Sequence, residues 1–167
     1  RQSKNTSILI NGDDYRRYHP NYHAIFAQYP DELVSLTSKF SSAFTEKMIE
    51  ELSEAHRNLI IEGTGRTTEV PIHTANLLIA KGYRVSMAVI AVRPELSLLS
   101  TLHRFCSMSE MGTVPRPTAV LAHNTVIQNL PYNLDILYQS NLFTEMQIID
   151  RREEIIWCST HAEEMPS

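Results

Sequence analysis

Residues 59–68 read Leu59-Ile60-Ile61-Glu62-Gly63-Thr64-Gly65-Arg66-Thr67-Thr68, an apolar run that ends in a carboxylate, two glycines and an arginine. A short apolar run closed by turn residues predicts a buried strand. In α/β proteins, ligands bind just beyond the carboxyl ends of such strands. The glycines let a ligand approach the backbone, and Arg66 can hold a phosphate or carboxylate through two parallel hydrogen bonds. A plain strand-to-helix turn with a solvated Glu62 and Arg66 gives the same pattern, so this stretch alone leaves both interpretations open.

Strand and helix patterns alternate on both sides of this stretch. Apolar runs predict strands over residues 7–10, 59–61, 83–92, 146–149 and 155–157. Apolar spacing of three and four residues predicts helices over residues 23–28, 32–55 and 118–130, and a helix that starts at Pro94. A further helix is predicted from Thr67 or Thr68 to a stop at Gly82, and Asp31 is the predicted N-cap of the helix at 32–55. Pro131 is expected to interrupt the helix at 118–130, with a second helical piece continuing through Tyr138. The unbroken apolar run 87–92 suits a strand covered on both faces. This alternation predicts an α/β fold with a parallel sheet and helices on both faces.

Size and composition narrow the classes of function. The 167 residues fit one domain over 1–167, with a polar tail at 161–167 that we expect to fray. A net charge of -4 without a basic cluster argues against nucleic-acid binding. We find no apolar run of about 18 residues, and so expect no membrane span. Cys106 and Cys158 are the only cysteines, which favours a reducing cytoplasm. The chain begins with arginine, and we expect that residues precede it in the whole protein.

Four charged side chains follow the ends of predicted strands. Asp13 follows the strand at 7–10, Glu62 follows the strand at 59–61, and Arg104 and Arg116 come from the helix and loop after the third strand. Two carboxylates and two arginines at one sheet edge suit phosphoryl transfer, because a carboxylate can accept a hydroxyl proton and arginines can neutralise charge on the moving group. Alternatively, Asp13 caps a turn and the arginines form surface ion pairs.

Two other groups of residues give weaker predictions, one of a metal site and one of a thiol nucleophile. His19 and His23 are four residues apart, but Pro20 lies between them and no third metal ligand is near in sequence. A thiol nucleophile could be built from His103, Cys106 and His123. We expect a core cysteine and a surface histidine there instead.

Three blocks of sequence resemble the zeta-toxin family of bacterial toxin–antitoxin systems. The first block is Ile10-Asn11-Gly12-Asp13-Asp14-Tyr15-Arg16-Arg17-Tyr18-His19-Pro20, and the second is Ile61 to Thr68 through Val70-Pro71. The third runs from Arg104 to Arg116 and Pro117-Thr118, similar to the family's pair of lid arginines before a helix. Their order and spacing match the family from about Ile8 to Asn141. Asn11 departs from the pattern, because the family often has an acid there.

This resemblance implies a P-loop kinase fold and a reaction that needs ATP and Mg²⁺. The implied substrate is UDP-N-acetylglucosamine, phosphorylated on a sugar hydroxyl, which would block synthesis of cell-wall precursors. The implied partner is a small helical antitoxin that obstructs the ATP site. By motif, Asp13 would be the general base, while Arg104 and Arg116 would contact the ATP phosphates. Glu62 would hold substrate or help to organise the metal site, next to the pocket residues Gly63, Thr64, Gly65 and Arg66.

One family motif is missing between Arg1 and Ser167. The chain contains no Gly-x-x-x-x-Gly-Lys-Ser/Thr loop, which cradles a triphosphate with backbone N–H groups and supplies a phosphate-binding lysine. In the family this loop precedes the strand that matches residues 7–10. We therefore expect this chain to be the later part of a kinase and to transfer no phosphate alone. The alternatives are a non-catalytic module that binds the sugar nucleotide or an antitoxin, and a kinase for another small hydroxyl compound.

Overall fold

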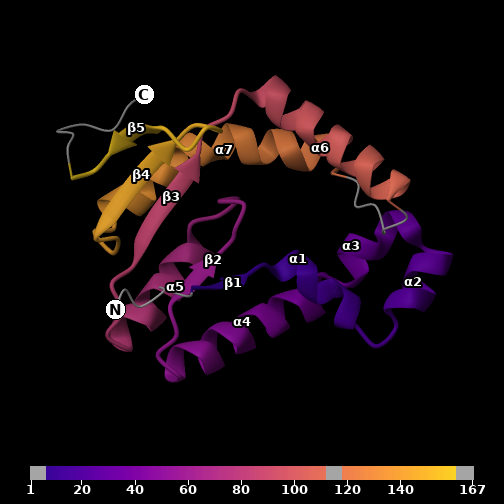
Figure 1. Ribbon diagram of the computed structural model, residues 1–167, viewed down its shortest axis with the longest axis horizontal. Coiled ribbons are helices and arrows are strands. Elements are labelled where there is room, and N and C mark those ends of the chain that lie inside the picture. The colour runs from indigo at the N-terminus through magenta and orange to yellow at the C-terminus, as the bar shows by residue number, and fades with distance from the viewer. Residues whose placement is uncertain (1–6, 112–117, 161–167) are drawn as a thin grey trace, which may run out of the picture. The chain divides into compact units, whose positions relative to one another are not determined.

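The computed structural model describes residues 7–111 and 118–160 of the chain (Figure 1). Contacts divide the chain into two compact units, residues 1–63 and residues 64–167. The expectation of one domain over 1–167 stays a prediction. The tail expected to fray, residues 161–167, lies outside the described residues.

The first unit begins and ends with the strands of a parallel pair. Its elements are β1 (Ile8–Ile10), α1 (Gly12–Tyr15), the 3-10 turn η1 (Arg16–Tyr18), α2 (Tyr22–Gln28), the 3-10 turn η2 (Pro30–Glu32), α3 (Leu33–Leu36), α4 (Ser38–Glu54) and β2 (Leu59–Ile61). The register pairs Ile10 with Ile61, so both strands end at the same level. Helix α4 contacts both strands. The core contains Ile10, Leu33 and Ile49, each at most 6% exposed.

The helix predicted over 32–55 is broken in the structure. A 3-10 turn contains Asp31, which was the predicted N-cap, and α3 ends at Leu36 before α4 begins at Ser38. Thr37 stands at the break, fully buried, with its hydroxyl donating to the carbonyl of Leu33 at 2.6 Å. A threonine hydroxyl that bonds back along a helix competes with the regular ladder and bends it. Apolar spacing could not reveal this break, because it carries through the threonine unchanged.

The second unit is built on a mixed three-stranded sheet. Its elements are α5 (Glu69–Ala80), β3 (Ser86–Ile90), α6 (Pro94–Glu110), α7 (Val120–Gln139), β4 (Glu145–Ile149) and β5 (Ile155–Cys158). The strand order is β3-β4-β5. Strand β4 pairs with β3 in parallel and with β5 in an antiparallel hairpin. The parallel pair confirms the α/β prediction, and β5 is an antiparallel addition to it.

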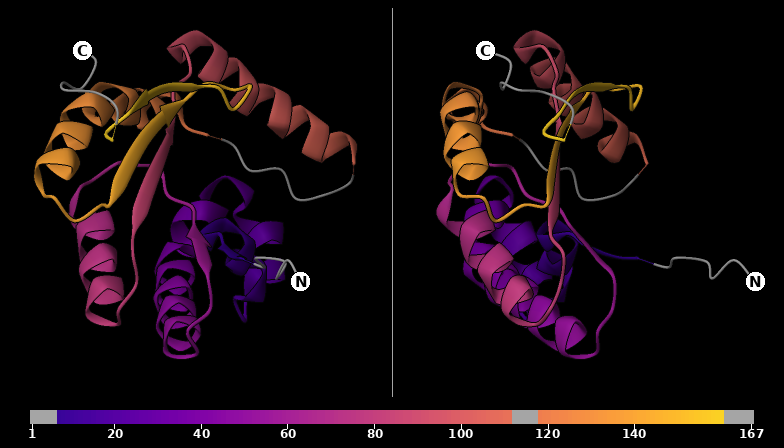
Figure 2. Two further views of the ribbon diagram at one scale, coloured as in Figure 1. Left: turned by 60° about the vertical axis from the view of Figure 1, so that its left-hand side comes forward. Right: turned by 90° about the vertical axis from the view of Figure 1, so that its left-hand side faces the viewer.

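One face of this sheet holds the core of the unit. Leu137, Met146 and Trp157 are buried there, and the partly buried residues around them are Ile72, Met87, Leu134, Tyr138, Phe143 and Ile148. Helices α5 and α7 therefore cover this face. In the right-hand view of Figure 2, α7 lies on one side of the β3–β4 pair and most of α6 on the other. Among the described residues, none of the helices is both long and apolar enough to cross a bilayer.

Two details of the second unit correct the sequence predictions. Strand β3 alternates, with Met87 and Val89 partly buried but Ile90 61% exposed, so it is not covered on both faces within this unit. Pro131 does not interrupt α7, which runs unbroken from Val120 to Gln139. Proline removes one helical hydrogen bond, but buried Leu137 and its neighbours pack the second half of α7 onto the sheet and keep the helix continuous.

Candidate functional site

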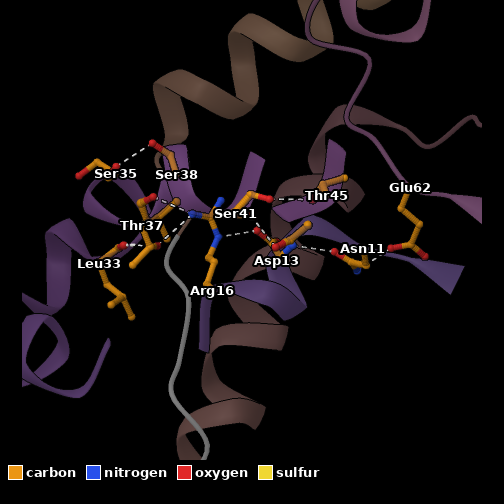
Figure 3. Close-up of polar contacts among 12 residues, drawn as sticks. Asn11, Asp13, Arg16, Leu33, Ser35, Thr37, Ser38, Ser41, Thr45 and Glu62 are labelled. Atoms are coloured by element: carbon orange, nitrogen blue, oxygen red, sulfur yellow. Dashed lines mark hydrogen bonds and ion pairs between the residues drawn. The ribbon is translucent and has the colours of Figure 1, made fainter. Parts of the chain in front are cut away.

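Glu62 lies directly beyond the carboxyl end of β2, as the sequence predicted. Its backbone N–H donates to the carbonyl of Ile10 at 3.0 Å, which extends the pairing of the two strands by one residue. The side chain of Asn11, which follows β1, donates from Nδ2 to Glu62 Oε2 at 2.6 Å (Figure 3). The structure therefore joins the polar ends of two parallel strands through one amide–carboxylate hydrogen bond.

Asp13 lies in the first turn of α1, where the sequence predicted only a polar turn after the strand. Asn11 is the N-cap of this helix, and its Oδ1 accepts from the backbone N–H of Asp13 at 3.0 Å. Asn11 therefore bonds to Glu62 through its side-chain nitrogen and to the backbone of Asp13 through its side-chain oxygen. The Asp13 carboxylate itself pairs with Arg16, whose Nε lies 2.9 Å from Oδ1. Asn11, and not Asp13, is therefore the N-cap of α1.

The short helix α1 is packed closely against α4. The hydroxyl of Ser41 donates to the carbonyl of Gly12, and a Cβ added at Gly12 would lie 3.0 Å from Thr45 Oγ1. Glycine therefore permits this approach. The Tyr15 ring packs on Phe44 with 4.8 Å between ring centroids. Burial raises the pKa of the Tyr15 hydroxyl, with the nearby Asp14 carboxylate adding to the effect.

Thr64, Gly65 and Arg66 begin the second unit as a loop before α5. Gly65 adopts a left-handed conformation with φ of 65°. Asn133, only 8% exposed on α7, donates from Nδ2 to the carbonyls of Gly65 at 2.9 Å and Arg66 at 3.0 Å. The loop is thus held through its backbone, while the side chains of Thr64 and Arg66 are exposed.

Sequence reasoning did not identify Asn133. An amide inside the apolar stripe of α7 was the available signal, since a buried amide must find hydrogen-bond partners. Its partners lie 67 and 68 residues earlier in the chain, so no local pattern could name them.

Arg104 is exposed on α6, and its guanidinium donates to Thr118 Oγ1 at 3.3 Å. Arg116, the second predicted arginine, lies outside the described residues. The predicted convergence of Asp13 and Glu62 with these arginines joins residues of different units, and it stays a prediction.

The expectation of a core cysteine and a surface histidine is wrong for Cys106 and His123. His123 is 9% exposed, not on the surface, and its Nε2 lies 3.0 Å from Ser97 Oγ. Cys106 is exposed, and Cys158 is the buried cysteine. Over the described parts of the chain, no three histidine, cysteine, aspartate or glutamate side chains are grouped closely enough to hold a metal ion.

Comparison with known proteins gives consistent matches. The family model described as "Zeta toxin" matches residues 1–161. "Toxin zeta" of Streptococcus pyogenes is 38% identical over 151 residues, which cover 90% of this chain and 53% of that protein. "Toxin PezT" of Streptococcus pneumoniae serotype 4 is 36% identical over 153 residues, or 91% of this chain and 60% of that protein.

A solved structure agrees with the sequence matches. It belongs to the PezAT chromosomal toxin–antitoxin system of Streptococcus pneumoniae, and it matches with a TM-score of 0.84 and 34% identity over 94% of this chain. The match covers 62% of that chain. The present chain therefore spans little more than half the length of the relatives it matches.

Proposed function

Because the chain belongs to the zeta toxin family, we propose that it supplies the acceptor side of a kinase that phosphorylates UDP-N-acetylglucosamine with ATP. Asp13 is the general base for the sugar hydroxyl in this proposal. Glu62, Gly63, Thr64, Gly65 and Arg66 bind the sugar nucleotide. Arg104 and Arg116 stabilise charge on the transferred phosphoryl group.

The placement of Asp13 is the observation that carries the proposal. It stands beyond the carboxyl end of a parallel strand, 46% exposed, with its backbone capped by Asn11 and its carboxylate held by Arg16. A base must lie within hydrogen-bond reach of the proton it accepts. Here the carboxylate takes the proton of the sugar hydroxyl while that oxygen bonds to the γ-phosphorus. The bond from the γ-phosphorus to the bridging oxygen breaks, and ADP leaves with the electron pair.

Glu62 fits a single contact to Mg²⁺. Magnesium in phosphotransferases takes one or two carboxylates together with waters and substrate phosphates. Glu62 offers one exposed carboxylate, which accepts a hydrogen bond from the amide of Asn11, and this amide brings no second negative charge. Bound Mg²⁺ would neutralise charge on the phosphates of ATP. The residues between Arg1 and Ser167 include no phosphate-cradling glycine loop with its lysine.

The loop around Gly65 supports sugar-nucleotide binding. Asn133 holds the carbonyls of Gly65 and Arg66, so the loop backbone is fixed before a ligand arrives. Fixing a loop in advance lowers the entropy cost of binding. Arg66 is exposed and can pair with a diphosphate through two parallel hydrogen bonds.

A small helical antitoxin is the proposed partner, and arrest of cell-wall synthesis is the proposed consequence. The matched pneumococcal structure belongs to a toxin–antitoxin system, and this supports the proposal for the present chain. Co-expression with the antitoxin gene should relieve growth arrest. Arrest that persists in the presence of every adjacent small open reading frame would argue against this partner.

The reaction is tested on the longest natural form of the protein that contains this chain. That protein is incubated with ATP, Mg²⁺ and UDP-N-acetylglucosamine, and the sugar nucleotide is analysed by mass spectrometry. A product heavier by one phosphoryl group, formed by the wild type and only at a small residual rate by Asp13→Asn, supports the proposal. Absence of product from the wild type overturns it. Calorimetry that then finds sugar-nucleotide binding without ATP binding would instead support a non-catalytic module.

A further inference from the structure

Arg16 connects the candidate base to the framework of the first unit. Its Nε lies 2.9 Å from Asp13 Oδ1, and one terminal nitrogen donates to the carbonyl of Val34 at 2.8 Å and to Thr37 Oγ1 at 3.1 Å (Figure 3). The side chain of Arg16 is only 14% exposed, whereas that of Asp13 is 46% exposed. A largely buried cation thus holds an exposed carboxylate.

At its other end, the Arg16 guanidinium bonds to Thr37, which is itself buried and hydrogen-bonded. Thr37 is 0% exposed and donates its own hydroxyl proton to the carbonyl of Leu33, which is itself only 2% exposed. The two acceptors of its terminal nitrogen are the carbonyl of Val34, within α3, and the hydroxyl of Thr37, at the break between α3 and α4. Arginine side chains commonly satisfy carbonyls at the ends of helices. The residues at and before this break therefore provide two buried or partly buried acceptors for the guanidinium.

The planar guanidinium suits this task. It presents five donors in fixed directions, so it can bond a carboxylate on one side and a carbonyl and a hydroxyl on another. A lysine has a single point of charge and cannot reach all three acceptors with the same geometry. Arg16 and the Asn11 cap together hold Asp13 through its carboxylate and through its backbone N–H.

We infer that Arg16 is a positioning residue for phosphoryl transfer, which holds the Asp13 carboxylate in the orientation that meets the acceptor hydroxyl. The inference rests on the proposed function and adds a residue to it. In this inference Arg16 acts through the Asp13 carboxylate, to which its Nε is bonded. Loss of this pair would change the orientation of the Asp13 carboxylate, and a displacement of about 1 Å can lower a rate a hundredfold.

The test compares Arg16→Gln with wild type in the longest natural form of the protein, using ATP and UDP-N-acetylglucosamine. We expect kcat to fall about ten- to a hundredfold, while the KM for the sugar nucleotide changes less than about threefold, because the proposed effect of Arg16 passes through the base and not through ground-state binding. Arg17→Gln is the matched control. It removes the neighbouring charge from an exposed arginine that lies over the Tyr18 ring, 5.1 Å from its centroid, and kcat should stay within about twofold.

A double-mutant cycle separates positioning from general destabilisation. In the Asp13→Asn background, Arg16→Gln should lower the residual rate no further, because its effect passes through the missing carboxylate. An equal loss in both backgrounds overturns the inference. Arg16→Lys keeps the charge and should recover only part of the rate. If Arg16→Gln proves unfolded by circular dichroism, a fully active Arg16→Lys overturns the inference, and a folded Arg16→Lys with reduced kcat and unchanged KM supports it.

The same data distinguish this inference from the proposed function. A wild-type protein that transfers no phosphoryl group overturns both. An active wild type with an unaffected Arg16→Gln overturns only the role of Arg16.

Discussion

The amide of Asn11 donates to the carboxylate of Glu62 across 2.6 Å, joining the ends of two strands that are 51 residues apart in sequence. The other polar atom of Asn11 caps α1 at Asp13. The Asn11 side chain thus links Glu62, a candidate substrate-binding residue, to the helix that carries Asp13, the candidate base. A substitution at Asn11 can therefore remove the bond to Glu62 and keep the cap of α1.

Asn11→Asp should lower the free energy of unfolding by about 1 kcal/mol at neutral pH. Aspartate keeps the oxygen that caps α1 but has no donor for Glu62, and it places a like charge beside that carboxylate. Urea unfolding followed by circular dichroism measures the difference. Asn76→Asp, the same change at an exposed position on α5, is the control. Equal stability of N11D and N76D would show that the amide–carboxylate bond contributes nothing.

Asn133→Ala should destabilise the protein by about 2 kcal/mol and weaken sugar-nucleotide binding. The substitution removes the donor for the carbonyls of Gly65 and Arg66 and leaves a cavity beside them. Urea unfolding and calorimetry with UDP-N-acetylglucosamine give the two readouts. Asn129→Ala, at an exposed position on the same helix, should change neither. Unchanged affinity in a destabilised N133A would limit Asn133 to a structural role.

Gly65→Ala should cost about 1–2 kcal/mol of stability, the usual strain of a left-handed conformation for a residue with a Cβ. Its φ is 65°, and the added Cβ would lie 2.8 Å from Leu130 Cδ1, a side-chain end that can move aside. Gly63→Ala is the matched control, because a Cβ there meets nothing within 4 Å. Thermal or urea unfolding of the pair measures the contrast. A G63A variant as unstable as G65A would refute the conformational explanation.

Arg104→Ala should lower kcat about a thousandfold if this residue acts as the arginine finger. Its only described hydrogen-bond partner is Thr118 Oγ1 at 3.3 Å, so stability should change little. Steady-state kinetics with ATP and the sugar nucleotide test the role. Arg93→Ala, on the N-terminal side of α6 and 3.8 Å from Glu95, is the control. A loss below about tenfold would reject a transition-state contact by Arg104.

Asp150 should make the stability of the protein depend on acid pH. The backbone N–H of Glu154, together with Arg152, lowers the pKa of the Asp150 carboxyl. Because the folded pKa lies below the unfolded value of about 4, this stabilisation is present above pH 4 and is lost as the pH falls through the folded pKa.

The check for Asp150 is the unfolding free energy of wild type and Asp150→Asn measured from pH 7 to pH 3. The wild type should be the more stable at pH 7, and the difference should shrink towards pH 3. A constant difference across this range would rule out the carboxylate as its origin.

The strands and the type of most helices followed from local patterns. The apolar runs at 7–10 and 146–149 became β1 and β4 within one residue, because a strand needs only a short β-rich run with turn residues after it. The break at Thr37 did not follow, because it depends on a hydroxyl–carbonyl bond and on the guanidinium of Arg16 beside it. Pro131 was predicted to interrupt a helix, but α7 continues through it, because packing of α7 outweighs the lost hydrogen bond.

For the candidate site, local sequence patterns were enough to name the candidate residues. Asp13 and Glu62 could be named from their positions after apolar runs, and Gly65 from the turn it must form, because these depend on residues adjacent in the chain. The hydrogen-bond partners of these residues followed only from the fold. Arg16 reaches Thr37, Asn11 reaches Glu62, and Asn133 reaches Gly65 across 21, 51 and 68 residues. Side-chain hydrogen bonds act over about 3 Å, so only folding brings such partners within range.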